Sequence, residues 1–172
     1  PHGFNATGIM YGLNGYPIDA SNLAIFKGDM MSLEADGNVS ENTGSLAHNI
    51  GAAESGTAIT SAVKAILAAS TAGTILMHYH PAQMYYAQID AGAGAVAVNY
   101  GENMDIAVTH AGNTTTGISG MELDNSSSAS SAALVMSVHG IYDAPGNKIG
   151  DHAELRCSVN EHFMSTNVGV GV

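Results

Sequence analysis

Cationic side chains are scarce in this chain of 172 residues. It has four Lys and Arg residues against fifteen Asp and Glu residues, which gives a net charge of −11. Proteins that bind nucleic acids use Lys and Arg to neutralise phosphates, and anionic membrane surfaces attract the same side chains. We therefore expect neither nucleic acid nor a membrane among its partners.

Cysteine and long apolar runs are equally rare. The single cysteine, Cys157, excludes a framework of internal disulfides, and its place among alternating apolar residues predicts a buried, unreactive thiol. No apolar run approaches the roughly 18 residues of a membrane span. The first residues lack the cationic start and apolar core of a signal peptide, so we expect synthesis in the cytoplasm.

Charged residues of both signs together make up only 11% of the chain, which is roughly half of the usual share. The surface must therefore be built largely from small, uncharged side chains. Such a surface loses little conformational entropy when another protein covers it. This composition fits a protein with extensive subunit contacts, and it fits a weakly charged monomer equally well.

The hydrophobic pattern predicts an all-β protein of one domain. Short alternating segments, bounded by Gly, Pro, Asn and Asp, are typical of strands and turns. We expect a single-domain β-sandwich or β-barrel with long loops. Asn14-Gly15 predicts a two-residue hairpin turn, and further turns are predicted at residues 36–38, 111–116 and 145–147. The predicted strands cover residues 9–13, 16–18, 23–26, 29–33, 46–50, 75–79, 84–89, 96–100, 105–109 and 133–142, with a last strand closing on Asn160.

At most one short helix is expected, at residues 57–69. Thr57 can cap it, and its apolar residues fall on one face; a pair of buried strands is the other interpretation of this Ala-rich segment. The folded domain is expected to cover residues 9–163. Residues 1–8 and 164–172 are expected as extended terminal arms that reach a neighbouring subunit, or as frayed ends.

Two histidines, His78 and His80, would lie on the same side of a strand, where side chains alternate with a period of two. Such a pair can begin a metal site, but three or four converging ligands are needed and no second clustered pair appears. We therefore expect hydrogen-bonded structural histidines, with no metal and no cofactor. The other histidines are His2, His48, His110, His139, His152 and His162.

No catalytic residue is predicted. Ser61 and Lys64 fit the S-x-x-K pattern of penicillin-binding enzymes, but the companion motifs are absent. Glu122 and Asp124 would share a strand face, yet the polar run that follows is typical of a turn, and nothing specifies the cleft that acid–base chemistry requires. The other close acidic pairs are Glu102 with Asp105 and Asp151 with Glu154. We therefore do not expect an enzyme.

Four segments in the second half carry a family resemblance through their order and spacing. They are YYAQID at residues 85–90, GENMD at 101–105, TGISGMELD at 116–124, and HGIYDAPGNKIG at 139–150, ahead of a last strand that closes on NEH at 160–162. Together they resemble the cement, or decoration, proteins of tailed-phage capsids. The resemblance covers about half of the chain, and the Ala-rich segment 52–72 does not match the family.

The resemblance implies a structural virion protein that forms a homodimer or a homotrimer. It would bind the major capsid protein on the outside of an icosahedral shell and stabilise the contacts between capsid subunits. A carbohydrate- or host-surface-binding β-domain is the alternative, and a histidine-dependent metalloenzyme is a third hypothesis. The carbohydrate hypothesis predicts exposed aromatic rings, with Tyr11, Tyr16, Tyr79, Tyr85 and Tyr100 as candidates.

Overall fold

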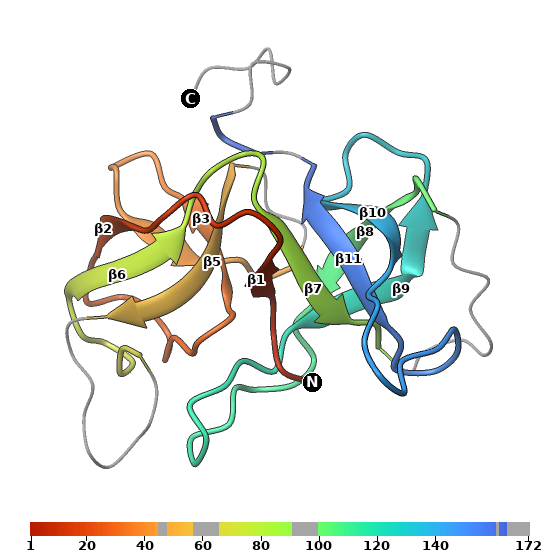
Figure 1. Cartoon of the computed structure of the whole chain (residues 1–172). Coiled ribbons are helices and arrows are strands. Elements are labelled where there is room, and N and C mark those ends of the chain that lie inside the picture. Colours follow the sequence, from red (N-terminus) through yellow and green to blue (C-terminus); the bar gives the residue numbers. More distant parts are fainter. Residues whose placement is uncertain (45–47, 57–65, 91–99, 161, 165–172) are drawn as a thin grey trace.

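The computed structural model describes residues 1–44, 48–56, 66–90, 100–160 and 162–164. Across these residues the chain forms eleven strands and no helix. The strands make two antiparallel sheets, and neither sheet closes into a barrel. The predicted all-β class is confirmed, and of the two predicted architectures the structure agrees with the β-sandwich. Figure 1 shows the five-stranded sheet on the left and the six-stranded sheet on the right.

The six-stranded sheet contains most of the second half of the chain. Its buried residues alternate along the strands: Cys157 lies opposite Val138 on one side and Tyr85 on the other, and all three are buried. This period of two turns one face of each strand toward the core. In spatial order the strands are β1 (Asn5–Thr7), β7 (Met84–Gln88), β11 (Glu154–Val159), β10 (Met136–Ile141), β8 (Asn103–Ala107) and β9 (Glu122–Ala129).

The five-stranded sheet is built from the first half of the chain. A turn at Asp36 and Gly37, as predicted, connects two of its strands, and the side chain of Asp36 accepts a hydrogen bond from the backbone N–H of Asn38 at 2.9 Å. In spatial order the strands are β2 (Asn14–Ile18), β6 (Gly73–His78), β5 (Asn49–Gly56), β3 (Met30–Leu33) and β4 (Val39–Glu41).

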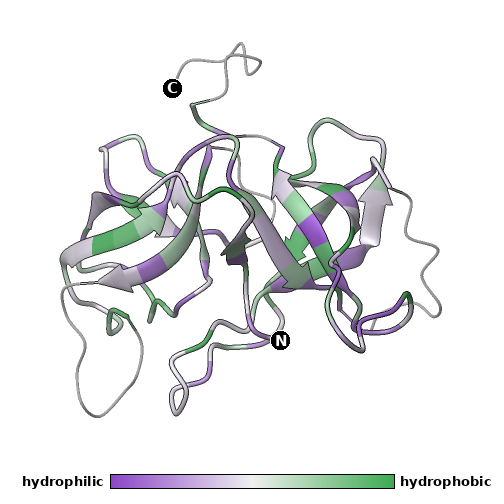
Figure 2. Cartoon of the chain, in the orientation of Figure 1, coloured by the Kyte–Doolittle hydropathy of each residue, from purple (hydrophilic) through white to green (hydrophobic). Residues whose placement is uncertain are grey.

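Each sheet has its own apolar cluster, and the two sheets are joined where these clusters meet. Met30 and Ala52 belong to the five-stranded sheet but pack into the cluster of the six-stranded sheet. The hydroxyl group of Tyr85 on β7 also donates a hydrogen bond of 2.8 Å to the backbone carbonyl of His78 on β6. Figure 2 shows apolar bands on the strands of both sheets. Full burial of a large side chain such as Leu123 contributes roughly 1.5–3 kcal/mol.

The predicted strands at 9–13 and 23–26 do not form, and two predictions of turns were also wrong. Asn14 and Gly15 do not form a hairpin turn: both lie within β2, where they pair with Met77 and Leu76 of β6. The polar run after Asp124 was predicted as a turn, but β9 continues through it to Ala129. In both places the backbone hydrogen bonds of a neighbouring strand outweigh the local turn preference of Asn, Gly and Ser.

The predicted helix at 57–69 is wrong over its described part. Residues 66–69 are not helical, and Leu67 forms a β-bridge with Ile25; residues 57–65 lie outside the described residues. The expected N-terminal arm packs on its own chain, because Phe4 is buried and β1 pairs with β7. The predicted strand at 96–100 and the predicted tail fall almost entirely outside the described residues.

Candidate functional site

Within the described residues, exposed apolar side chains gather in residues 9–13, which we call the apolar segment. Ile9 is 71% exposed, Met10 56% and Leu13 43%. Exposed apolar side chains are common singly, but a cluster marks a contact surface. Gly8 precedes the segment and Gly12 lies within it, with φ values of +72° and +91°, a backbone conformation that favours glycine.

The apolar segment is fixed to the domain at its centre. The ring of Tyr11 stacks on the ring of His80 with 4.0 Å between centroids. The backbone N–H of Tyr11 also points to the Gln83 side-chain oxygen at 3.4 Å. The segment therefore has a defined position while three of its side chains stay in solvent, and a preorganised surface of this kind loses little entropy on binding.

A groove of about 500 Å³ borders the apolar segment, and we call it the docking groove. Lys27 pairs with Glu54 there, and the other carboxylate oxygen of Glu54 lies 3.6 Å from Nε2 of His78. Burial lowers the pKa of His78, against the opposing effect of Glu54. The lining of the groove therefore combines ionic and apolar side chains. Its lining includes Met10, Leu13, Lys27, Glu54, His78 and Tyr86.

A second cavity, of about 610 Å³, lies between the two sheets, and we call it the junction cavity. The loop after β8 forms one wall, and Gly112 lets that loop approach the opposite wall: a Cβ at Gly112 would lie 2.0 Å from the ring of Phe26. A Cβ at Gly120 would similarly meet the carbonyl of His110 at 2.4 Å. Six residues define its character: Leu23, Phe26, Val108 and Met121 are apolar, and Asp29 and Glu41 are acidic.

The two carboxyl groups in the junction cavity have raised pKa values. Burial raises the pKa of Asp29 to about 6, against hydrogen bonds from Ser119 and from the backbone N–H of Phe26, the latter at 2.7 Å. Burial, together with repulsion from Asp29, raises the pKa of Glu41 to about 7. Among the described residues, the Glu41 carboxyl group has no hydrogen-bond or ion-pair partner.

The raised pKa of Glu41 predicts how Glu41→Gln changes stability. The folded protein holds this proton more tightly than the unfolded chain, so the contribution of Glu41 to the free energy of unfolding is complete below about pH 4.5 and is lost as the pH rises through about 7. E41Q should match the wild type at pH 4 and exceed it at pH 8. At pH 8 we expect E41Q to have a free energy of unfolding about 1 kcal/mol higher than the wild type, after allowing for screening by water.

Urea unfolding of both proteins at pH 4 and pH 8 measures this difference. Asp151→Asn, which removes one negative charge from an exposed turn, controls for the general relief of charge repulsion. If E41Q and D151N raise the free energy of unfolding equally at pH 8, ionised Glu41 does not destabilise the fold more than an exposed carboxylate does.

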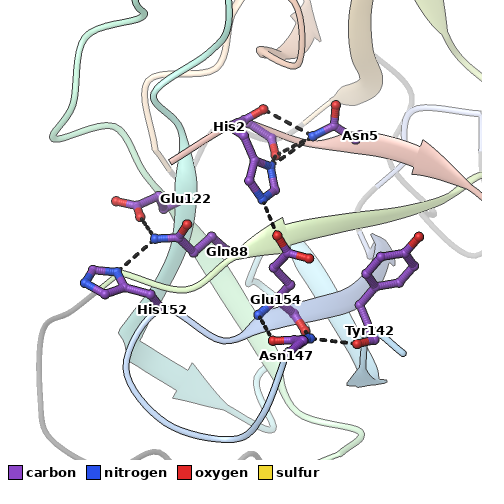
Figure 3. A network of polar contacts seen from close by, with 9 residues as sticks. His2, Asn5, Gln88, Glu122, Tyr142, Asn147, His152 and Glu154 are labelled. Carbon is purple, nitrogen blue, oxygen red and sulfur yellow. Dashed lines mark hydrogen bonds and ion pairs between the residues drawn. The ribbon is translucent and has the colours of Figure 1, made fainter. Parts of the chain in front are cut away.

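A polar network connects the start of the chain to the turn between β10 and β11 (Figure 3). Nε2 of His2 lies 3.0 Å from Oε1 of Glu154. Asn147 holds the turn itself: its side-chain amide donates to the backbone carbonyl groups of Tyr142 and Glu154, and its oxygen accepts from the N–H of Glu154. These contacts satisfy the backbone groups of a long connection, so we interpret them as structural.

A second chain of contacts reaches Glu122, which is almost fully buried. Gln88 donates to Oε1 of Glu122 at 3.0 Å and lies 2.8 Å from Nδ1 of His152 (Figure 3). Nδ1 of His110 lies 3.1 Å from the other carboxylate oxygen of Glu122. Asp124, which sequence analysis paired with Glu122, instead accepts hydrogen bonds from Ser126. The two acids therefore have separate partners.

The structure does not bring the predicted histidine pair together with further ligands. His78 faces Glu54, whereas His80 lies beyond the end of β6 and stacks on Tyr11. His162 is buried and lies 2.7 Å from the Ile50 carbonyl. In the described part of the chain, the group of three potential metal ligands that lies close enough to share an ion is acidic and largely exposed: Asp19, Glu34 and Asp36.

The remaining candidates from the sequence are the cysteine, the Ser61 and Lys64 pair, and the five tyrosines. Cys157 is buried, as predicted, and burial raises the pKa of its thiol. Ser61 and Lys64 lie outside the described residues. Of the five candidate tyrosines, Tyr85 is buried, Tyr16 and Tyr79 contact each other, and Tyr11 and Tyr100 are exposed.

The sequence patterns did not predict a site at Asp29 and Glu41. A signal for the pair exists, because the turn at Asp36 and Gly37 sets the register of β3 and β4 and places Glu41 opposite Met31, two residues from Asp29. The cavity wall from residues 108–121 has no such local signal.

Comparison of the chain with protein-family models, with curated proteins and with solved structures found no match. No helix long and apolar enough to span a membrane occurs among the described residues.

Proposed function

We propose that this chain is a structural virion protein. It binds the outside of an icosahedral phage capsid, forms a homo-oligomer there, and stabilises the contacts between major capsid protein subunits. The observation that carries the proposal is the apolar segment, which is exposed, clustered and fixed in place beside the docking groove. Preorganised, exposed apolar side chains are typical of the centre of a protein–protein interface.

The charge distribution supports a position on the outside of the shell, with a protein as the partner. Only Lys27, Lys148 and Arg156 supply permanent positive charge in the described part of the chain, and Lys27 is already paired with Glu54. A net charge of −11 disfavours contact with packaged DNA, because like charges repel. A position on the exterior avoids that repulsion.

The four segments that resemble cement proteins support the proposal through their common location. Residues 85–90 contribute to β7, 101–105 lead into β8, 116–124 lead into β9, and 139–150 connect β10 with β11. All of these strands belong to the six-stranded sheet. The resemblance therefore concerns one contiguous unit, whereas the described residues of the unmatched segment, 52–56 and 66–72, belong to the other sheet and its loops.

Particles that carry the protein are expected to withstand heat better than particles that lack it. A protein that binds only the assembled lattice stabilises it by mass action, by about 2.7 kcal/mol per site at a hundredfold excess over Kd. The temperature at which particles release their DNA should therefore be higher when the protein is bound. Thermal release followed with a DNA dye measures the difference, and adding purified protein back to deficient particles is the control. Identical release temperatures would contradict a stabilising role.

A further inference from the structure

The junction cavity combines apolar walls with acidic groups in a space suited to a ligand. Its volume of about 610 Å³ lies within the range of about 300–1,000 Å³ that is usual for binding sites. Leu23, Phe26 and Val108 provide apolar surface, and Asp29 and Glu41 provide negative charge. A ligand that fits both needs a hydrocarbon stem and a cationic head.

The charge in the junction cavity is unbalanced. None of the Lys and Arg residues in the described ranges lines it, and its one basic group, His110, lies against Glu122. Asp29 already accepts a hydrogen bond from the Phe26 backbone, whereas Glu41 has no partner among the described residues. A partly buried carboxylate beside a second acid is unfavourable until a cation approaches it. The site therefore favours a positively charged occupant that reaches Glu41.

A metal ion fits these walls poorly, because hard cations require about six to eight oxygen ligands and much of the lining is apolar. The side chains of Lys and Arg fit better, since their stems pack on apolar surface while their charged heads reach a polar group. The cavity is also larger than one such side chain needs, which leaves room for the backbone that carries it.

We propose that the junction cavity receives a Lys or Arg side chain from a loop of a partner protein, with the stem against Phe26 and Val108 and the cationic head at Glu41. The inference rests on the proposed function in one respect: the partner is the capsid lattice. The cavity then adds a charge-selective contact to the apolar contact made by residues 9–13.

Titration with a short peptide tests the site without the capsid. The probe is acetyl-Ala-Lys-Ala-amide, and its neutral counterpart carries norleucine in place of lysine. Amide NMR signals of Thr43, Val108 and Gly112, which line the cavity, should shift with the lysine peptide. Replacing lysine by norleucine, or introducing Glu41→Gln, should weaken binding about tenfold, which corresponds to about 1.4 kcal/mol. Asp151→Asn removes the same charge from an exposed turn and should leave the affinity unchanged.

The affinity for the lysine peptide should also increase with pH through about 7, where Glu41 ionises. Other titratable groups lie near Glu41: Asp29 and His110 line the same cavity, Asp19 and Glu34 line the neighbouring one, and Glu122 pairs with His110. The E41Q variant separates their contribution to the pH dependence from that of Glu41. Equal affinity for the two peptides, or an E41Q variant that binds like the wild type, would overturn the proposal.

Sedimentation with capsids then tests the partner. E41Q should bind shells about tenfold more weakly than the wild type, while D151N binds normally. If E41Q and the wild type bind shells equally, the junction cavity does not contact the capsid and this inference fails, but the proposed function stands. If the wild type does not bind shells, the proposed function and the partner named here both fail, whereas the peptide titration still reports on the cavity.

Discussion

Replacement of Gly51 by alanine is expected to lower the free energy of unfolding by about 4 kcal/mol. A Cβ at this position would lie 1.7 Å from the carbonyl oxygen of His78 and 2.8 Å from the hydroxyl oxygen of Tyr85. The φ angle of +150° is unfavourable for alanine as well. Overpacking costs about 1–3 kcal/mol and backbone strain a further 1–3 kcal/mol or so, and the hydrogen bond between Tyr85 and His78 would be displaced.

Urea unfolding, followed by circular dichroism, measures the effect of G51A. Gly37→Ala is the matched control, because Gly37 has a φ of +87° with no atom within 4 Å of an added Cβ. It should cost about 1 kcal/mol from strain alone. Should G51A prevent folding, Tyr85→Phe still tests the contact, with an expected loss of about 1 kcal/mol. A G51A variant as stable as G37A would contradict the role of this contact in joining the sheets.

Local sequence signals sufficed where the alternation is strong, as in β7, even though its partners β1 and β11 lie far away in the chain, and where a turn joins two neighbouring strands. Residues 84–89 alternate strongly, and β7 forms there with Tyr85 and Ala87 buried. Pro145 and Gly146 form a turn between β10 and β11, which pair as predicted. In these cases the turn chemistry and the apolar pattern favour the same structure, so the sequence alone suffices.

Long-range pairing explains most of what could not be predicted. Asn14-Gly15 has a strong local preference for a hairpin turn, but β6, some sixty positions later, pairs with it instead. Likewise, the polar run after Asp124 becomes a strand because β8 lies alongside it. Pairing partners so distant in the chain are not encoded in local periodicity.

The apolar segment and the acidic pair of the junction cavity could not be predicted from local sequence signals alone. The predicted strand at 9–13 was wrong, because a short apolar run looks the same in the sequence whether its side chains pack in a sheet or stay exposed on a loop. The acidic pair in the junction cavity depends on a register that brings Glu41 toward Asp29 and on a wall that comes from residues 108–121. Only the register of β3 and β4 follows from a local turn.

The largest expected effect on binding comes from the apolar segment. Replacement of Ile9, Met10 and Leu13 by serine should weaken binding to capsid shells roughly a hundredfold, because each is exposed in the free protein and central contact residues contribute about 1 kcal/mol or more. The free energy of unfolding should change little, since these side chains do not belong to either core cluster.

Ile149→Ser is the control for this variant, because Ile149 is an exposed apolar residue in the connection between β10 and β11. It should bind shells like the wild type. If the triple variant also binds like the wild type, the apolar segment is not the contact surface, and the observation that carries the proposed function is lost.

The most direct measurement is sedimentation of the unmodified protein with empty shells assembled from the major capsid protein encoded beside its own gene. We expect saturable binding at a fixed number of copies per shell, and no binding to the unassembled capsid protein. A protein that stays in the supernatant at every concentration, or a gene with no capsid protein encoded beside it, would contradict a role as a structural virion protein.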